Sequence, residues 1–284
     1  MDIYVSMVYT YCNENVTENW QSKLHEVTKM DFRKTFDSIP EQFDKWRPRY
    51  CDELFKEIIE YAAIQSGKSV LEIGPGTGQA TEPFLKTGCD YLAIELGENF
   101  VEFTKKKFGS YENFHIVNDD FETHDFGGQK FDLIFSAATI QWIPEEIGFP
   151  KIFHLLKNGG TLAMFMTRTD EKTPNGTLYD EIQKVYDEHF HVETRYTCSL
   201  EYDNVVNYGF TDYHYRDWKQ TRIYNADEYV EYLAGSMVEH ITLKEPYKSN
   251  FYNGVHEAVV KAGNKIILND TIALYLAEKP VVGV

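Results

Sequence analysis

The chain of 284 residues is long enough for one large domain, or for a domain with a cap, and its 43% hydrophobic residues suffice for a sizeable core. The chain has 28 Lys and Arg residues and 45 Asp and Glu residues, which gives a formal net charge of -17. This charge disfavours binding to nucleic acid, which proteins bind mainly through Lys and Arg. A small anionic substrate is still compatible with this charge, because a few local arginines can outweigh a distant net charge.

Cysteine usage and hydropathy narrow the class of protein further. Cys12, Cys51, Cys89 and Cys198 are far apart and form no C-x-x-C pair, which is typical of reduced thiols and not of a disulfide framework or a zinc site. No apolar run approaches the ~20 residues that cross a membrane, and the N-terminus lacks the pattern of a signal peptide. We therefore expect a cytoplasmic protein with neither a membrane nor a nucleic acid as its partner.

The first strong pattern is a strand followed by a glycine loop. A one-sided apolar stripe predicts a helix over residues 52–64. The next segment is apolar on both faces and ends in Glu72-Ile73-Gly74-Pro75-Gly76-Thr77-Gly78, where three glycines allow another group to approach the backbone closely. A helix is predicted from Gln79, with Pro83 in its first turn. Strand, loop and helix form the nucleotide-binding opening of a doubly wound α/β sheet.

The glycine spacing selects among cofactors. A dinucleotide fingerprint needs G-x-G-x-x-G, and Gln79 stands where its last glycine would be; the G-x-x-x-x-G-K-[ST] pattern is absent as well. The run resembles the first motif of the class I S-adenosylmethionine-dependent methyltransferases, in which an acidic residue precedes G-x-G-x-G. A glycine turn in some other α/β protein is the alternative. The resemblance implies S-adenosyl-L-methionine as the cofactor, bound in part by Glu72, Gly74, Pro75, Gly76 and Gly78.

The segment before the sheet extends this resemblance. Arg47-Pro48-Arg49-Tyr50 looks like the Tyr-x-x-x-Arg-Pro-x-Tyr-Pro pattern of many small-molecule methyltransferases, in which the segment folds over the cofactor. The match is partial, because Phe43 replaces an aromatic hydroxyl and Cys51 replaces a proline. Arg47 is thus a candidate partner of the cofactor carboxylate, which arginine can bind bidentately. A surface arginine before a proline turn fits the same residues.

The second predicted strand, residues 91–95, ends in Glu95, about 20 residues after the glycine loop. An acid at this point can accept hydrogen bonds from both ribose hydroxyls of an adenosine cofactor, whether NAD or S-adenosylmethionine. Glu95 could instead cap the next helix, to whose first turn Glu98 is assigned. Lys105, Lys106 and Lys107 lie in the last turn of that predicted helix, where cations complement the dipole.

The third predicted strand, residues 114–117, is followed by Asp119, Asp120 and Phe121. In the family an aspartate at this place accepts from the adenine amino group. Alignment on the strand favours Asp120, with Phe121 over the adenine ring and Asp119 as the near alternative. Adjacent carboxylates could also bind a metal, but a hard cation needs several converging oxygen ligands, and no metal is predicted.

The fourth predicted strand, residues 130–136, ends at Ser136, which we include among the cofactor-binding residues implied by the resemblance. Nucleic-acid amino-methyltransferases place a [DNS]-P-P-[YFW] signature here, and this chain has Ser-Ala-Ala-Thr. The following Ile-Gln-Trp run resembles that of trans-aconitate methyltransferases and their relatives, which esterify small carboxylic acids. Gln141 and Trp142 are therefore substrate candidates, although Trp142 would equally suit the core.

The remaining chain predicts the second half of a sheet. A helix over 145–157 is expected to end at Asn158-Gly159-Gly160, and its His154 fits a surface or packing role. After the fifth strand, residues 161–166, the loop containing Arg168 emerges at the carboxyl edge, where ligands bind, so Arg168 is a candidate for an anionic substrate group. Further strands are predicted near 211–221 and 271–277, and further helices near 178–190, 225–238 and 246–262.

Together these patterns predict a doubly wound α/β fold, a seven-stranded, mostly parallel, Rossmann-like sheet whose last strand is antiparallel. Residues 1–65 would form an N-terminal arm with cap helices and residues 66–284 the methyltransferase domain, with a helical insertion at about 225–262 that joins the arm as a lid. The expected function is methyl transfer from S-adenosyl-L-methionine to a small-molecule acceptor; a carboxylate or a hydroxyl is considered first, and amines and thiols stay open. The motifs also permit a non-catalytic S-adenosylmethionine-binding protein or an NAD-linked oxidoreductase, and they assign no catalytic base.

Overall fold

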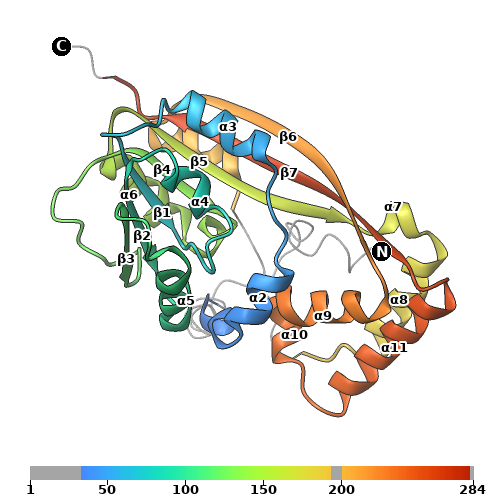
Figure 1. Ribbon diagram of the computed structural model, residues 1–284. Coiled ribbons are helices and arrows are strands. Elements are labelled where there is room, and N and C mark those ends of the chain that lie inside the picture. Colours follow the sequence, from blue (N-terminus) through green and yellow to red (C-terminus); the bar gives the residue numbers. More distant parts are fainter. Residues whose placement is uncertain (1–32, 193–199, 282–284) are drawn as a thin grey trace, which may run out of the picture. The chain divides into compact units, whose positions relative to one another are not determined.

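A computed structural model describes residues 33–192 and 200–281. Its seven strands form one sheet in the order β3-β2-β1-β4-β5-β7-β6 (Figure 1). Strands β1 to β5 pair in parallel, the last strands are antiparallel, and helices flank the sheet. The predicted fold class is therefore confirmed. The strands are β1 (Ser69–Ile73), β2 (Asp90–Glu95), β3 (Phe114–Asn118), β4 (Phe131–Ala137), β5 (Leu156–Asp170), β6 (Thr211–Tyr224) and β7 (Ile266–Glu278).

The position of β1 determines where a ligand can bind. β1 pairs with β2 on one side and with β4 on the other. The strands after β1 are thus added first on one side, as β2 and β3, and then on the other side, beginning with β4, so the strand order reverses beside β1. In open α/β sheets ligands bind at the carboxyl ends of the strands at such a reversal. The glycine loop follows β1 directly and therefore lies at the expected point.

The described helices belong to two compact units of the chain. The unit that we call the sheet unit comprises the described parts of Arg49–Thr167, Ser199–Trp218 and Ile272–Val284. The unit that we call the helical unit comprises those of Met1–Pro48, Arg168–Cys198 and Lys219–Thr271. The sheet unit contains α3 (Asp52–Tyr61), α4 (Thr81–Leu85), α5 (Glu98–Phe108), α6 (Glu145–Leu155) and the short helices η2 (Ile140–Trp142) and η3 (Tyr202–Tyr208).

The core of the sheet unit packs α3 and α4 against the strands. Phe84 of α4 stacks on Phe135 of β4 at 4.3 Å between ring centroids, and Phe135 stacks on Phe165 of β5 at 6.0 Å. Leu54 and Ile58 of α3 are fully buried in the same cluster. This aromatic layer positions the start of α4, and with it the end of the glycine loop.

The helical unit has a separate core, in which tyrosines and phenylalanines pack among aliphatic side chains. It contains η1 (Phe36–Ser38), α2 (Pro40–Trp46), α7 (Lys172–Asn175), α8 (Thr177–His189), α9 (Ala226–Ser236), α10 (Val238–Thr242) and α11 (Tyr247–Lys261). The predicted capping box is present, since the Asn225 side chain accepts from the Glu228 backbone and the Glu228 side chain from that of Asn225. The proposed domain boundaries and the lid stay predictions.

Three predicted helix limits are wrong. The helix predicted over 52–64 ends at Tyr61. The helix predicted over 145–157 ends at Leu155, because Leu156 already pairs with Phe131 as the first residue of β5. Gly159 has φ +74° and its N–H donates to the Lys279 carbonyl, so the glycines serve an irregularity of the strand and not a helix end. The helix predicted from Gln79 begins at Thr81, after a turn in which Gly78 has φ +80°.

Candidate cofactor site

All three glycines of the loop adopt the left-handed backbone conformation that favours glycine. The φ angles are +66° at Gly74, +57° at Gly76 and +80° at Gly78. A Cβ at Gly74 would lie 2.3 Å from Cγ2 of Thr139, and a Cβ at Gly78 would lie 2.2 Å from Cε2 of Phe108. The first and last glycines are therefore required by close packing as well as by backbone conformation.

Thr139 is a residue of this site that the sequence analysis missed. Its hydroxyl donates to the Gly74 carbonyl at 3.0 Å, so the loop after β4 contacts the loop after β1. The preceding residue, Ala138, has φ +56°, a conformation that costs a non-glycine residue energy and that clusters at functional sites. The turn at Ala138 therefore places Thr139 in contact with Gly74, the first glycine of the loop. The sequence signal for this was only the position of Thr139 after a strand end.

Glu95 reaches from β2 to the glycine loop. Its side chain is 7% exposed, and its Oε2 accepts from the Gly76 N–H at 2.9 Å while its Oε1 accepts from the Gly97 N–H at 2.8 Å. Each carboxylate oxygen can accept more than one hydrogen bond. The structure thus joins two predicted cofactor residues directly, at the carboxyl ends of neighbouring strands.

Glu72 differs from Glu95 in its surroundings. It is 1% exposed, and its Oε2 accepts from the hydroxyls of Thr81 at 2.7 Å and of Tyr91. Its Oε1 is buried without a hydrogen-bond partner. Burial raises the pKa of Glu72 to about 7, against the lowering effect of the two hydroxyls. The acidic residue of the motif is therefore enclosed behind the glycine loop, between β1, β2 and α4.

Asp120 lies in a tight turn after β3. Its Oδ1 accepts from the Glu122 N–H at 2.9 Å, and its own N–H donates to Oδ1 of Asp119 at 2.8 Å. Phe121 is 4% exposed and lies 6.0 Å from Phe126 between ring centroids. The turn thus holds Asp120 at the edge of the sheet unit and directs Phe121 into an aromatic cluster. An adenine stacked on Phe121 stays a prediction.

The loop after β4 contains the remaining candidates of the sheet unit. Ser136 is fully buried, and its hydroxyl donates to the Ile73 carbonyl at 3.4 Å. Gln141 donates to the Ala138 carbonyl at 2.9 Å and accepts from the Tyr202 hydroxyl at 3.4 Å. Trp142 is half-buried in η2. The arrangement orients Gln141 from two sides.

The two candidate arginines, Arg47 and Arg168, belong to the helical unit. The Arg47 guanidinium donates to the Ser236 carbonyl at 3.3 Å and lies 5.4 Å from the ring centroid of Phe43. Arg168 is half-buried at the end of β5. Their roles toward a cofactor or a substrate stay predictions.

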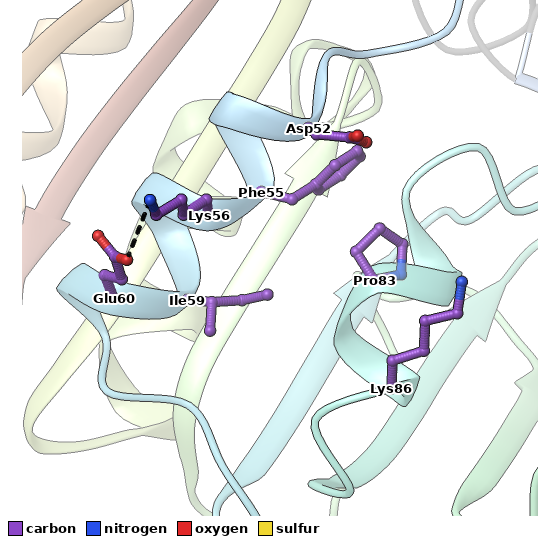
Figure 2. A pocket seen from close by; sticks show the side chains of 7 residues that line it. All are labelled: Asp52, Phe55, Lys56, Ile59, Glu60, Pro83 and Lys86. Atoms are coloured by element: carbon purple, nitrogen blue, oxygen red, sulfur yellow. Dashed lines mark ion pairs between the residues drawn. The ribbon is translucent and has the colours of Figure 1, made fainter.

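A separate groove of about 400 Å³ lies between α3 and α4. Figure 2 shows side chains of both helices around it, with Lys56 and Glu60 forming an ion pair at 3.8 Å along α3. None of the predicted cofactor or substrate residues lines this groove, whose residues are Asp52, Phe55, Lys56, Ile59, Glu60, Pro83 and Lys86. We therefore assign the candidate site to the glycine loop.

Within residues 33–192 and 200–281, no three or more His, Cys, Asp and Glu side chains gather so that they could hold a metal ion. The described helices include none with the length and apolar character needed to cross a membrane. The cytoplasmic location stays a prediction.

Comparison with known proteins decides the family of the sheet unit. Residues 71–164 match the family model described as a methyltransferase domain. This segment of the chain therefore carries a methyltransferase domain. This confirms the resemblance found in the glycine loop, the enzyme class expected for the domain, and S-adenosyl-L-methionine as the cofactor of that class. The matched segment contains all predicted cofactor residues except Arg47.

The related sequences include methyltransferases that cover different shares of this chain. A malonyl-[acyl-carrier protein] O-methyltransferase of Ilyobacter polytropus is 38% identical over 35% of this chain and 39% of the relative. Ribosomal RNA small subunit methyltransferase A of Pseudomonas putida is 31% identical over 38% and 40%. The chain thus spans about two fifths of the length of these relatives. A Dictyostelium discoideum protein, named as a methyltransferase without a substrate, is 24% identical over 85% of this chain and 84% of its own.

A solved structure agrees with the fold. Phosphoethanolamine N-methyltransferase 2 of Haemonchus contortus, in complex with phosphomonomethylethanolamine and S-adenosylhomocysteine, has a TM-score of 0.52 and 17% identity, over 88% of this chain and 60% of that chain. At this identity the likeness concerns the fold alone. It agrees with the seven-stranded methyltransferase sheet described above.

Proposed function

We propose that this protein binds S-adenosyl-L-methionine at the glycine loop and transfers its methyl group to a small-molecule acceptor. The contact of the Glu95 carboxylate with the Gly76 N–H carries this proposal. It joins an acid that suits ribose hydroxyls to a loop that suits close approach of a ligand. The residues proposed to bind the cofactor in this unit are Glu72, Gly74, Pro75, Gly76, Gly78, Glu95, Asp120, Phe121 and Ser136.

The chemistry requires position more than reactive side chains. The bound cofactor supplies an activated methyl group on a sulfonium, which an acceptor lone pair attacks while the C–S bond breaks and its electrons stay on sulfur. Holding an acceptor in line for such a displacement can contribute ~7–11 kcal/mol. The close packing of Thr139 on Gly74 supports the proposal on the cofactor side of the site.

We further propose a small carboxylic acid as the acceptor. A carboxylate needs no general base, and none is assigned in the site. The Ile-Gln-Trp run of η2 resembles that of enzymes that esterify such acids, and Gln141 is held in place by two hydrogen bonds. An O-methyltransferase named for a malonyl group is among the relatives. Gln141, Trp142 and Arg168 are the proposed substrate residues.

RNA is the second acceptor class, because ribosomal RNA methyltransferases are also relatives. We favour the small molecule on two grounds. The net charge of -17 opposes a polyanion, and the segment after β4 reads Ser-Ala-Ala-Thr in place of [DNS]-P-P-[YFW].

The cofactor proposal is tested by calorimetric titration with S-adenosylhomocysteine. We expect binding that Glu95→Ala weakens at least tenfold, because the ribose acceptor and the contact with Gly76 are both lost. Glu98→Ala is the matched control, since Glu98 is exposed in the first turn of α5 and should leave the affinity unchanged. NADH serves as the competing ligand. Absence of S-adenosylhomocysteine binding would overturn the proposal. Preference for NADH would also overturn it and would favour an oxidoreductase.

The acceptor proposal is tested by methyl transfer from labelled cofactor to a panel of mono-, di- and tricarboxylic acids, with ribosomal RNA as the other arm. Methyl ester formation on an acid, reduced by Gln141→Ala, is the expected result. Transfer to RNA alone would refute the small-molecule acceptor. Cofactor binding without any transfer across the panel would instead favour a non-catalytic binding protein.

A further inference from the structure

Lys151 lies outside every motif of the sequence analysis and makes an unusual set of contacts. It projects from α6, and its Nζ donates to the backbone carbonyls of Glu122 at 3.2 Å and His124 at 2.7 Å. The same ammonium lies 5.2 Å from the ring centroid of Phe121 and 5.5 Å from that of Phe126. One cation thus fixes two carbonyls and covers two aromatic rings of a single turn.

This turn, residues 119–126, is the one that contains Asp120. It is rich in negative charge, and the charge of Lys151 acts on the carboxylates of Asp119, Asp120, Glu122 and Asp125. Burial lowers the pKa of Lys151, although these four carboxylates oppose that effect. The half-buried ammonium therefore sits among carboxylates that would otherwise repel one another within seven residues of chain.

Three further hydrogen bonds of the turn are accepted by Asp120. Its carbonyl accepts from the N–H groups of Thr123 at 3.1 Å and His124 at 2.9 Å, and its Oδ1 accepts from the Glu122 N–H. His124 in turn bonds Oδ2 of Asp119 through Nδ1 at 2.8 Å. Since Lys151 holds the carbonyls of residues 122 and 124, it fixes the far end of the same turn whose near end presents the Asp120 carboxylate.

We infer that Lys151 is a positioning residue that holds the Asp120 carboxylate where it accepts from the exocyclic amino group of adenine, and so makes the site selective for adenine. This inference rests on the proposed cofactor and deepens it. It assigns to α6 a part in cofactor recognition that is separate from its packing against the sheet. Loss of the Lys151 charge should therefore affect recognition of one group on the cofactor, not the whole of it.

The chain offers a closely matched control in Lys279. Its Nζ also donates to two backbone carbonyls, those of Phe153 and Leu156, each at 2.9 Å. It likewise lies over an aromatic ring, 4.9 Å from the centroid of Phe153, and burial lowers its pKa as well. Lys279 makes the same kinds of contact as Lys151 but with a different segment of the sheet unit.

The experiment compares the affinities of S-adenosylhomocysteine and S-inosylhomocysteine, in which a carbonyl replaces the adenine amino group. For the wild type we expect the adenosyl compound to bind at least about tenfold more tightly, because Asp120 accepts from the amino group and faces the carbonyl oxygen without a donor. Lys151→Met should reduce this ratio to near one by weakening only the adenosyl compound. Lys279→Met and Lys151→Arg should keep the wild-type ratio.

The outcomes separate the inference from the function on which it rests. If the wild type binds neither compound, the proposed cofactor is wrong. If the wild type discriminates and Lys151→Met keeps the ratio, Lys151 only packs, and the inference is wrong whatever the melting temperature does. If Lys151→Met does not fold, Lys151→Gln, which keeps a donor but removes the charge, decides by the same ratio.

Discussion

Replacing Glu72 by Gln should stabilise the protein at alkaline pH and change it little in acid. Glu72 is enclosed between β1, β2 and α4, with one oxygen bonded to the hydroxyls of Tyr91 and Thr81 and the other buried without a partner. A glutamine keeps the oxygen that accepts from both hydroxyls and cannot ionise. The substitution therefore removes the cost of a buried charge while retaining the hydrogen bonds.

The magnitude follows from the pKa of Glu72. Burial raises this pKa from an ordinary 4.5 to about 7, so between these two pH values the folded protein binds a proton that the unfolded chain releases. Stability contributed by this group is complete below pH 4.5 and is lost as the pH rises through about 7. The wild type should thus lose roughly 2 to 3 kcal/mol relative to Glu72→Gln between pH 5 and pH 8.

Urea unfolding of both proteins at pH 5 and pH 8, without cofactor, measures this difference. Burial also raises the pKa of Glu171, in the helical unit, to about 7, so the wild-type profile alone does not isolate one carboxylate. The difference between wild type and Glu72→Gln does, because Glu171 is present in both. An advantage of the variant that is the same at both pH values, or a wild type that is more stable at pH 8, would refute the reasoning.

Three further substitutions, measured by urea unfolding, test the packing of the two units. Gly78→Ala should lower the free energy of unfolding by about 2 to 4 kcal/mol, because the new Cβ would meet Phe108 and φ is +80°. Gly128→Ala is the control and should lower it by only about 1 to 2 kcal/mol, because φ is +83° but no atom lies within 4 Å. Equal losses would contradict the steric argument. Asp270→Asn should cost about 3 to 5 kcal/mol by leaving the buried Arg222 guanidinium without its carboxylate; a loss below about 1 kcal/mol would show that other partners suffice.

The fold class and the place of the glycine loop could be predicted because the signals for the strands and the loop are local. Apolar runs bounded by Gly and acidic residues specify strand ends within a few residues, as at Ile73 and Glu95. The end of α6 could not be predicted in the same way. A glycine pair after an amphipathic segment fits a helix stop as well as a strand irregularity, and the carbonyl that accepts from Gly159 belongs to Lys279, far along the chain.

The contacts of Thr139 and Lys151 could not be predicted from the sequence for a related reason. Both side chains bond backbone carbonyls of segments that are distant along the chain, residues 74, 122 and 124, and backbone carbonyls have no residue-type signature. A motif consists of residue types at a fixed separation along the sequence. Thr139 and Lys151 instead contact segments that only the folded chain brings near them. Residues that position a motif are therefore harder to predict than the residues of the motif itself.

Glu72 and Glu95 show what spacing along the sequence does determine. Both acids end or nearly end a parallel strand, and the motif correctly places them on neighbouring strands of the site. Their surroundings differ because the groups around each carboxylate differ. Glu72 bonds side-chain hydroxyls at the start of α4 and on β2, while Glu95 lies beside two backbone N–H groups of loops. Backbone N–H groups at a loop are also where a ligand approaches. Glu95, which is bonded to the loop, is thus suited to contact the ribose directly, and Glu72 would contribute to the cofactor site by holding the start of α4 behind the loop.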